Sequence, residues 1–428
     1  MFKKIILFIL IFVFIIVGGY LLLKIQGLVL DLQNLKIIKT GSLAFSIYPT
    51  IEKIYLNNHQ FKITPPLLSH FYLINNIKPG FYNLQINLPN YFSYNKNIFI
   101  KSGLTTNLNT IYLIPKTPST FLLNQHITDA IISDNFIIYK KNNEILTNKT
   151  SIKGQEFYQL DQQNDLLITK NNKTYFFTNL IAPDSSININ LLFNNLLVNK
   201  LNAQPTEIQA IFFHPFNKNH LLIQTKNKLY DLSLKNNITF IVSTTSTQYI
   251  AIGKTEIFLF NKNNLQIYNL ILNTMTTISM PPFRIQNIQL LSNNNLIFIL
   301  TTDGNLWIYQ QNNKTFIPLL NHIKQFIVSP DDKWLIILTT KNVWFYDINS
   351  NKLIPTDLVN NDISNLQYGV VPDMFFFKQN NNLFISDMVM SPLNINKIAD
   401  NIKKYFIQDK YIYVLDNNNN FYLINLNL

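Results

Sequence analysis

Apolar residues follow three different patterns along this chain of 428 residues. An unbroken apolar run extends from Ile5 to Leu23, and apolar and polar positions alternate over residues 40–115. Residues 116–428 contain many short apolar runs separated by turn residues, without the uninterrupted spacing of i, i+3, i+4 and i+7 that marks an amphipathic helix. The pattern predicts an all-β protein behind one N-terminal helix.

The run from Ile5 to Leu23 follows Lys3-Lys4 and precedes Lys24. At ~1.5 Å of rise per residue, such a run just crosses a hydrocarbon core of ~30 Å, so residues 1–24 are expected to form a cytoplasmic tail and a single transmembrane helix. The preceding lysines predict a single-pass protein of the cytoplasmic membrane, with the N-terminus inside and the bulk of the chain outside. A cleaved signal peptide is the alternative, but the run exceeds the usual ~7–15 residue core.

Residues 25–39 form a connector with partly strand-like alternation, which is either a stalk or a first strand docked on the next domain. Within residues 40–115, Leu43, Phe45 and Ile47 alternate with small residues, as expected of a strand with one buried face. Asn57-Asn58 and Lys78-Pro79-Gly80 are turn signals. About six short strands in this region predict a small β-sandwich.

Several segments of this region resemble the PEGA domain: GSLAFSIYP at 41–49, IYLNN at 54–58, Thr64-Pro65, and IKPGFYNL at 77–84. The resemblance implies an extracytoplasmic β-sandwich of bacterial surface proteins, with a structural or adhesive role and no catalytic residues. The sequence departs from the family at Asn90-Tyr91, where Gly-Tyr is usual, and at 49–52, which lack the Gly and Ala of the naming motif.

Residues 116–428 contain an internal repeat of strand, turn, strand, tight turn and strand. Three copies run from Ile211 to Leu232, from Ile288 to Tyr309 and from Phe326 to Ile348. A unit of about 40 residues is the length of a four-stranded propeller blade, and the remaining length predicts about seven blades. The Ser-Pro-Asp-Asp or His-Pro turn and the aromatic-Asp third strand resemble WD40-like and TolB-type propeller repeats. An array of several β-sandwiches is the alternative.

Composition narrows the classes of partner. Hydrophobic residues make up 47% of the chain and charged residues 14%, and the net charge is +12. Arg284 is the only arginine and the lysines are scattered singly, whereas a phosphate-binding protein would be expected to use clustered arginine, so nucleic acid is not expected as a partner. Weak attraction to an anionic cell-wall polymer fits the charge better. The chain contains no cysteine, which excludes disulfides and thiolate chemistry.

Few residues suggest chemistry. His214 and His220 lie six residues apart, which is not a recurrent metal spacing, and Asp331-Asp332 is interpreted as a solvated turn. The segment that begins at Asp416 lacks the glycine and the terminal glutamate of a calcium-binding loop. Trp307, Trp334 and Trp344 fall on predicted strands, where we expect them to pack in the core. No nucleotide-binding or nucleophile-elbow motif is present. We therefore expect no catalytic, cofactor-binding or metal residues.

These patterns together predict a membrane-anchored extracytoplasmic binding or scaffold protein of the bacterial cell envelope. It would recognise an envelope protein or a cell-wall glycan through propeller loops. The alternative is a propeller-based polysaccharide hydrolase or lyase. That activity requires catalytic carboxylates about 5–10 Å apart, and carboxylates gathered at the central channel would favour it.

Overall fold

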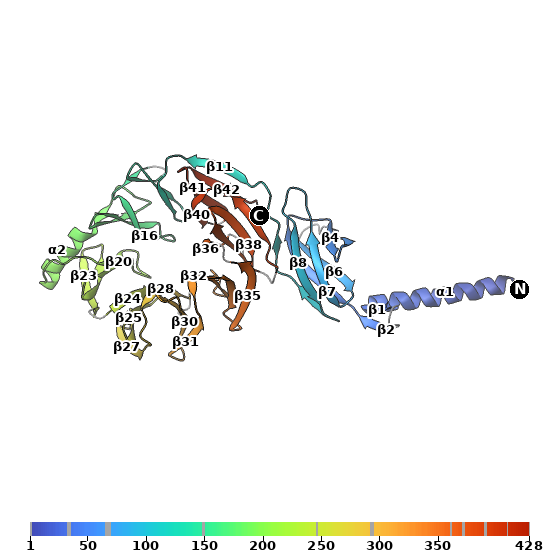
Figure 1. Cartoon of the computed structure of the whole chain (residues 1–428). Helices are drawn as coiled ribbons and strands as arrows, with labels where there is room; N and C mark the ends of the chain where they lie inside the picture. The colour runs from blue at the N-terminus through green and yellow to red at the C-terminus, as the bar shows by residue number, and fades with distance from the viewer. Residues whose placement is uncertain are drawn as a thin grey trace.

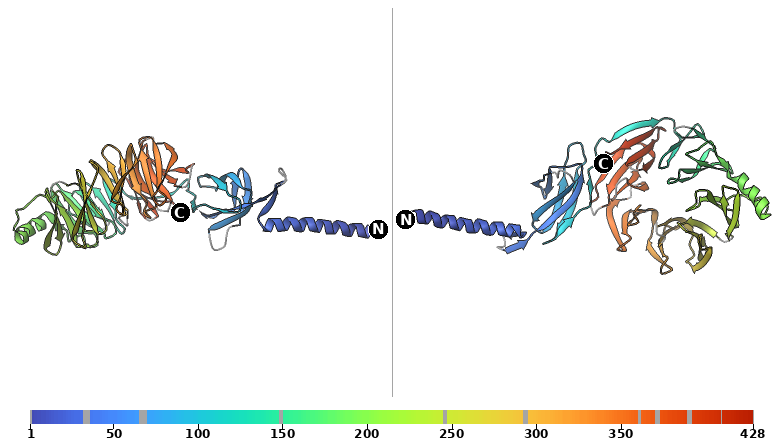
Figure 2. Two further views of the ribbon diagram at one scale, coloured as in Figure 1. Left: turned by 90° about the horizontal axis from the view of Figure 1, so that it is seen from below. Right: turned by 180° about the vertical axis from the view of Figure 1, so that it is seen from behind.

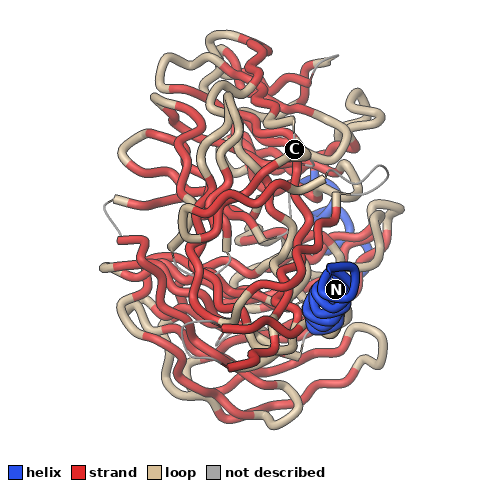
Figure 3. Tube along the Cα trace, turned by 90° about the vertical axis from the view of Figure 1, so that its right-hand side faces the viewer, coloured by secondary structure: helices blue, strands red, loops and turns tan. Residues whose placement is uncertain are grey.

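The computed structural model describes residues 2–31, 36–64, 70–147, 150–244, 247–291, 295–359, 362–369, 373–388, 392–408 and 410–427, with side chains of 2–9, 30–31 and 248 left out. A helix, a small β-sandwich and a ring of sheets follow one another along the chain (Figure 1). Both views of Figure 2 show the helix at one end of the molecule and the ring at the other. The two helices stand out in Figure 3 against a chain built mainly of strands.

The N-terminal helix α1 (Phe2–Ile25) ends at Gly27, where φ is +70°, and a hairpin of β1 (Leu28–Asp31) and β2 (Lys36–Lys39) follows. Within the described residues, no helix combines the length and the apolar character needed to cross a membrane. The predicted transmembrane helix over Ile5 to Leu23, the attachment to the cytoplasmic membrane through it and the single-pass membrane location are therefore wrong.

Two sheets face each other in the sandwich. In the first, β3 pairs with β6, β9 and β10; in the second, the order is β5-β4-β7-β8. The bounds are β3 (Gly41–Tyr48), β4 (Lys53–Leu56), β5 (His59–Lys62), β6 (Phe71–Ile77), β7 (Gly80–Ile86), β8 (Tyr94–Ile100), β9 (Thr105–Asn107) and β10 (Ile111–Tyr112). The alternation over Leu43, Phe45 and Ile47 is confirmed, because all three side chains are fully buried in the core between the sheets. The expected turn at Asn57-Asn58 has both residues in the left-handed region.

The rest of the chain forms eight four-stranded antiparallel sheets in a ring. The seven sheets that are contiguous in sequence are β12 (Asp129–Ile132) to β15 (Ser151–Ile152), β16 (Glu156–Asp161) to β19 (Ile187–Asn188), β20 (Ala210–Phe213) to β23 (Asn237–Ser243), β24 (Thr247–Ile252) to β27 (Thr274–Ser279), β28 (Ile285–Leu290) to β31 (Thr315–Leu320), β32 (Ile323–Val328) to β35 (Lys352–Val359) and β36 (Ile363–Tyr368) to β39 (Ile395–Ala399).

The two central strands of these seven sheets are β13 (Ile137–Lys141) and β14 (Glu144–Thr147), β17 (Leu166–Asn171) and β18 (Thr174–Asn179), β21 (His220–Gln224) and β22 (Lys228–Ser233), β25 (Glu256–Asn261) and β26 (Asn264–Asn269), β29 (Leu296–Thr301) and β30 (Leu306–Gln310), β33 (Trp334–Thr339) and β34 (Asn342–Asp347), and β37 (Met374–Gln379) and β38 (Asn382–Asp387). The second strands carry nearly continuous buried residues, such as β29 and β33, because each blade is packed between two others.

The eighth sheet closes the ring. Its three inner strands, β40 (Ile402–Gln408), β41 (Tyr411–Asp416) and β42 (Phe421–Asn425), come from the C-terminus, whereas its outermost strand, β11 (Ser119–Asn124), comes from before the first complete blade. In Figure 1, β11 lies along β42 at the top of the ring. The chain therefore contains an eight-bladed β-propeller, and its two ends are held together by backbone hydrogen bonds of one sheet.

The three predicted repeats are confirmed as the first three strands of three blades, beginning at β20, β28 and β32. The prediction of about seven blades is wrong by one. Tight hairpins shorten each blade below the ~40–45 residues assumed from the repeat, so the same length of chain forms eight. Left-handed asparagines close several of these hairpins, for example Asn142-Asn143 and Asn380-Asn381. The ring of sheets also excludes an array of separate sandwiches.

Glutamine side chains join neighbouring blades at the innermost strands. Each of four glutamines hydrogen-bonds to the backbone of the next blade around the ring. The pairs are Gln289 Oε1 with Val328 N (3.0 Å), Gln325 Oε1 with Leu366 N (3.2 Å), Gln367 Nε2 with Tyr405 O (3.0 Å) and Gln408 Nε2 with Ser133 O (2.7 Å). These bonds satisfy backbone groups that inner strands of separate sheets leave unpaired.

One helix interrupts the propeller, contrary to the expectation of a region without helices. Helix α2 (Ile189–Leu201) lies at the outer rim, far from the sandwich (Figure 1), and buries Phe193 and Leu197 in a core cluster with residues of the blades β16–β19 and β20–β23. Its ends are capped, since Asn188 Oδ1 accepts a hydrogen bond from Leu191 N and Asn202 adopts a left-handed backbone. Apolar residues at 189, 192, 193, 196 and 197 have the spacing of an amphipathic helix, a signal in the sequence that was not recognised as such.

Candidate binding site between the sandwich and the propeller

The residues singled out in the sequence lie apart from one another. Asp331 is in the turn before β33, where its carboxylate accepts a hydrogen bond from Ser329 Oγ (2.6 Å) and forms an ion pair with Lys333 Nζ (2.9 Å). Asp416 caps the hairpin after β41 by accepting hydrogen bonds from Asn420 N and Nδ2. Both carboxylates therefore have local partners in their turns, the arrangement expected of turn residues.

His214 and His220 face each other across the hairpin of β20 and β21, with ring centroids 5.8 Å apart. His220 Nδ1 lies 2.8 Å from Asp231 Oδ1, and burial lowers the pKa of His214 below its ordinary value. Among the described residues, no group of three or more histidine, aspartate or glutamate side chains is arranged to hold a metal ion.

One cavity at the innermost strands bears on the hydrolase alternative. A cavity of about 530 Å³ lies at the ends of the innermost strands, between β12, β16, β20 and β40. Its described lining is mostly apolar and includes Ile131, Leu160, Phe213 and Phe406, with Asp161 as its single carboxylate. Asp161 already accepts hydrogen bonds from Asn164. The described lining of this cavity therefore contains one carboxylate, whereas glycoside hydrolysis uses a pair.

A second cavity, of about 560 Å³, lies between the sandwich and the propeller; we call it the interdomain cleft. Its sandwich wall comes from β8, β9 and the segments beside them, with Ile98, Phe99, Leu104 and Leu108. Phe99 and Leu104 are 44% and 58% exposed, although both are large apolar side chains. Concave, mainly apolar sites of this size with a few polar groups are typical of ligand-binding sites.

The propeller wall of the cleft comes from blade β32–β35 and from the blade after it. Trp334, Phe345, Ile354 and Pro355 belong to the first of these blades, and Met388 follows β38. Trp334 is the one tryptophan of the three that lines this cavity, whereas Trp307 packs against Phe283 at 4.9 Å between ring centroids. The expectation that tryptophans serve packing thus holds for Trp307, and Trp334 is partly available to a ligand.

A buried ion pair fixes the two walls relative to each other. Lys96 Nζ of β8 lies 3.0 Å from Asp387 Oδ2 of β38, and the two side chains are 1% and 9% exposed. Lys96 Nζ also donates to Pro392 O (3.2 Å), and Asp387 accepts two further hydrogen bonds from Asn394. Burial lowers the pKa of Lys96, and the negative charge of Asp387 opposes that shift.

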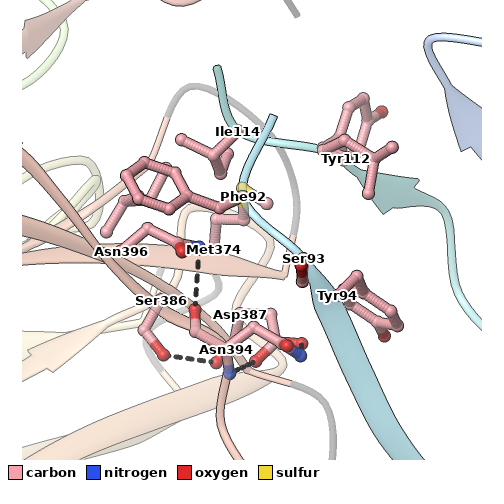
Figure 4. Close-up of a pocket in the computed structure, with 12 residues that line it drawn as sticks. Phe92, Ser93, Tyr94, Tyr112, Ile114, Met374, Ser386, Asp387, Asn394 and Asn396 are labelled. Carbon is pink, nitrogen blue, oxygen red and sulfur yellow. Dashed lines mark hydrogen bonds between the residues drawn. The ribbon is translucent and has the colours of Figure 1, made fainter. Parts of the chain in front are cut away.

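Further contacts surround this ion pair. Asn95 N donates to Asn394 Oδ1 (2.9 Å), so a propeller side chain reaches the edge of β8. Figure 4 shows Phe92, Tyr94, Tyr112 and Ile114 of the sandwich opposite Met374, Asp387 and Asn394 of the propeller, around a small cavity. Ile114 belongs to the propeller-side core cluster, whereas Leu113 is buried in the sandwich core. Apolar packing on both sides of one charged pair makes the interface a continuous contact.

Asn109 and Asp373 form a second polar contact at the cleft, with 2.8 Å between Nδ2 and Oδ2. Burial raises the pKa of Asp373 above its ordinary value, and the hydrogen bond from Asn109 opposes that shift. No sequence pattern signalled these pairs: Lys96 and Asp387 are separated by 291 positions, and each stands in an ordinary strand sequence.

Comparison with known proteins finds similar solved structures but no matching protein family. No protein-family model and no curated protein matches the chain. Among solved structures, the C-terminal WD40 domain of Sif2 is 12% identical, with 72% of this chain and 99% of that chain covered and a TM-score of 0.49. BamB from Moraxella catarrhalis is 8% identical over 72% and 99%, with a TM-score of 0.46. Hsv2 of Kluyveromyces lactis is 8% identical over 65% and 99%, with a TM-score of 0.45. The propeller assignment itself rests on the eight sheets of this chain.

Proposed function

We propose that this chain is a non-catalytic binding protein that holds a protein partner in the interdomain cleft. The observation that carries the proposal is a cavity of about 560 Å³ whose apolar walls come from two domains. The buried pair of Lys96 and Asp387 keeps these walls at a fixed separation, so the site exists before the partner arrives. Preorganisation of this kind raises affinity because less conformational entropy is lost on binding.

The nature of the walls supports a protein partner over a glycan. Polar side chains such as Asn97 and Thr106 also line the cleft, but most of its exposed surface is apolar, whereas each sugar hydroxyl taken from water needs a hydrogen-bond partner. An envelope protein or glycan as partner stays a prediction from the sequence, and the cleft favours the first of the two. The single carboxylate in the described lining of the cavity between β12, β16, β20 and β40 supports a binding role over hydrolysis.

The domain division is part of the proposal. Residues 25–39 would act as a connector, residues 40–115 as a PEGA-like structural module and residues 116–428 as the propeller. The burial of Leu113 in the sandwich core and of Ile114 in the propeller-side cluster supports a boundary close to residue 115. In this arrangement the sandwich acts as one wall of the site as well as a spacer.

Site-specific photocrosslinking tests the proposed function. A photoreactive benzoylphenylalanine in place of Leu104, in the full chain in its own cells, is expected to give a discrete crosslinked product. The same probe in place of Phe240, an exposed residue of β23 in a blade away from the cleft, is the matched control. Loss of the Leu104 product on adding Trp334→Ala would support the cleft as the site. Equal products from both positions, or none from Leu104, would overturn the proposal.

A further inference from the structure

The edge strand β8 forms one wall of the interdomain cleft and pairs with β7 alone. An edge strand presents unpaired backbone groups that can bind another strand. At its propeller end the edge is already in use, because Asn95 N donates to Asn394 Oδ1. At its other end, Phe99 O accepts from Thr106 Oγ1 (3.0 Å). Asn97 lies between these two points and lines the cleft.

The direction of the Asn97 backbone follows from its neighbours. Residues two apart in a strand point their N–H and C=O groups to the same side, so Asn97 shares the outward direction of Asn95 and Phe99. The ladder partner of Asn97, Asn83, supports the same direction. Asn83 O accepts a hydrogen bond from Asn57 N (3.0 Å) on the other side of β7, so the backbone groups of Asn83 point away from β8. The pair of Asn83 and Asn97 is therefore a non-hydrogen-bonded pair, and the N–H and C=O of Asn97 face the cleft.

We infer that the cleft binds an extended peptide segment that adds as a strand to β8 at Asn97. This inference rests on the proposed function and names the class and binding mode of the partner. A peptide residue opposite Asn97 would exchange two backbone hydrogen bonds with it, and only a peptide-like ligand supplies both a donor and an acceptor at that spacing. The two neighbouring peptide residues would then point to the same face as Ile98, whose side chain is buried and lines the cavity.

Charge at the cleft indicates the polar character of this segment. Lys101 lies on the sandwich wall, five positions beyond Lys96, or about 17 Å at ~3.4 Å per residue. Its side chain is exposed, and it forms no ion pair with another described residue. Asp373 lies on the propeller wall. The complementary peptide carries apolar side chains at its centre and an acidic side chain at the Lys101 end.

Peptide selection on the intact protein tests the inference. A random dodecapeptide library displayed on phage is panned on the immobilised full chain, and the best binder is synthesised with a fluorescent label. The same peptide with N-methylated backbone amides is the ligand control. Asn97→Pro removes an outward N–H and leaves the β7–β8 ladder intact. Gln60→Pro is the matched protein control, because Ile63 N bonds inward to Glu52 O and Gln60 on the opposite edge strand β5 therefore also faces outward.

We expect a micromolar dissociation constant that Asn97→Pro and N-methylation each weaken at least tenfold and Gln60→Pro leaves within twofold. Lys101→Glu is expected to weaken binding and to shift the selected peptides from acidic to basic. If Trp334→Ala weakens binding while Asn97→Pro and N-methylation do not, strand addition is overturned and the cleft survives as a binding site. If panning gives no peptide while Leu104 crosslinks a partner, the extended-peptide mode fails and the proposed function stands. Failure of both overturns both.

Discussion

Lys96 of the sandwich and Asp387 of the propeller form a buried ion pair, with 3.0 Å between Nζ and Oδ2 and side chains that are 1% and 9% exposed. No other ion pair between described residues is as deeply buried; the remaining pairs lie at least one-fifth exposed. The desolvation of two charges is offset only because each also has hydrogen-bond partners, Pro392 O for Lys96 and Asn394 for Asp387. The pair therefore specifies how the two domains meet more than it adds net stability.

Removing one partner of this pair is expected to be costly. Lys96→Met leaves Asp387 charged and buried, which should reduce the free energy of unfolding by about 3–5 kcal/mol in urea denaturation. Lys101→Met, an exposed lysine just beyond the same strand, is the matched control and should change it by less than ~0.5 kcal/mol. A loss below about 1 kcal/mol for Lys96→Met would mean that water reaches Asp387.

Asp373 should make stability depend on pH. Because burial raises its pKa, the folded chain binds more protons than the unfolded chain between the ordinary pKa and the raised one. Stability contributed by the protonated form is thus lost as pH rises through that window. Asp373→Asn should raise the urea midpoint at pH 7, and the gain should shrink towards pH 4. Asp134→Asn, at an exposed position, is the control; a gain that is independent of pH would contradict this account.

The glutamine bridges can be tested at Gln325, which both donates to Leu366 O (3.4 Å) and accepts from Leu366 N (3.2 Å). Leu366 is 2% exposed, so Gln325→Met leaves its backbone groups without partners away from water. The expected loss is about 1–3 kcal/mol in the free energy of unfolding, measured by thermal or urea denaturation. Gln155→Met, at an exposed glutamine, should be neutral. Equal effects at both positions would show that the bridge is not what stabilises the blade contact.

Ring closure depends on β11, because this strand carries the N-terminal end of the propeller into the C-terminal sheet. Prolines at both Thr120 and Phe121 remove a ladder N–H whichever of the two faces β42, at a cost of about 1–3 kcal/mol for the backbone group left without a partner. The same pair at Thr276 and Thr277, exposed positions of the outer strand β27, should cost less than half of that, since β27 stays tied to its own hairpin. Circular dichroism melting curves would decide, and equal shifts would refute a special role of the closing strand.

Much of the fold followed from local pattern. The period-2 alternation at Leu43, Phe45 and Ile47 identified a core strand, and the repeated unit ending in Trp344-Phe345-Tyr346-Asp347 identified propeller blades. Such signals are readable because a side chain's face in a strand depends only on its position. The blade count and α2 were missed for local reasons too: hairpins closed by left-handed asparagines use less chain, and α2 hides its apolar stripe among Asn, Ile and Phe residues common throughout the chain.

The sequence by itself determined that this is a β-built protein with a small sandwich before a repeated blade unit, since hydrophobic periodicity and turn residues act over a few positions. Only the tertiary structure decided where a partner can bind. The pairing of Lys96 with Asp387 across 291 positions, the outward direction of Asn97 and the apolar walls of the cleft all arise from how two domains pack. Contacts between distant residues leave no spacing in the chain, because burial is a property of the assembled core and not of any one segment.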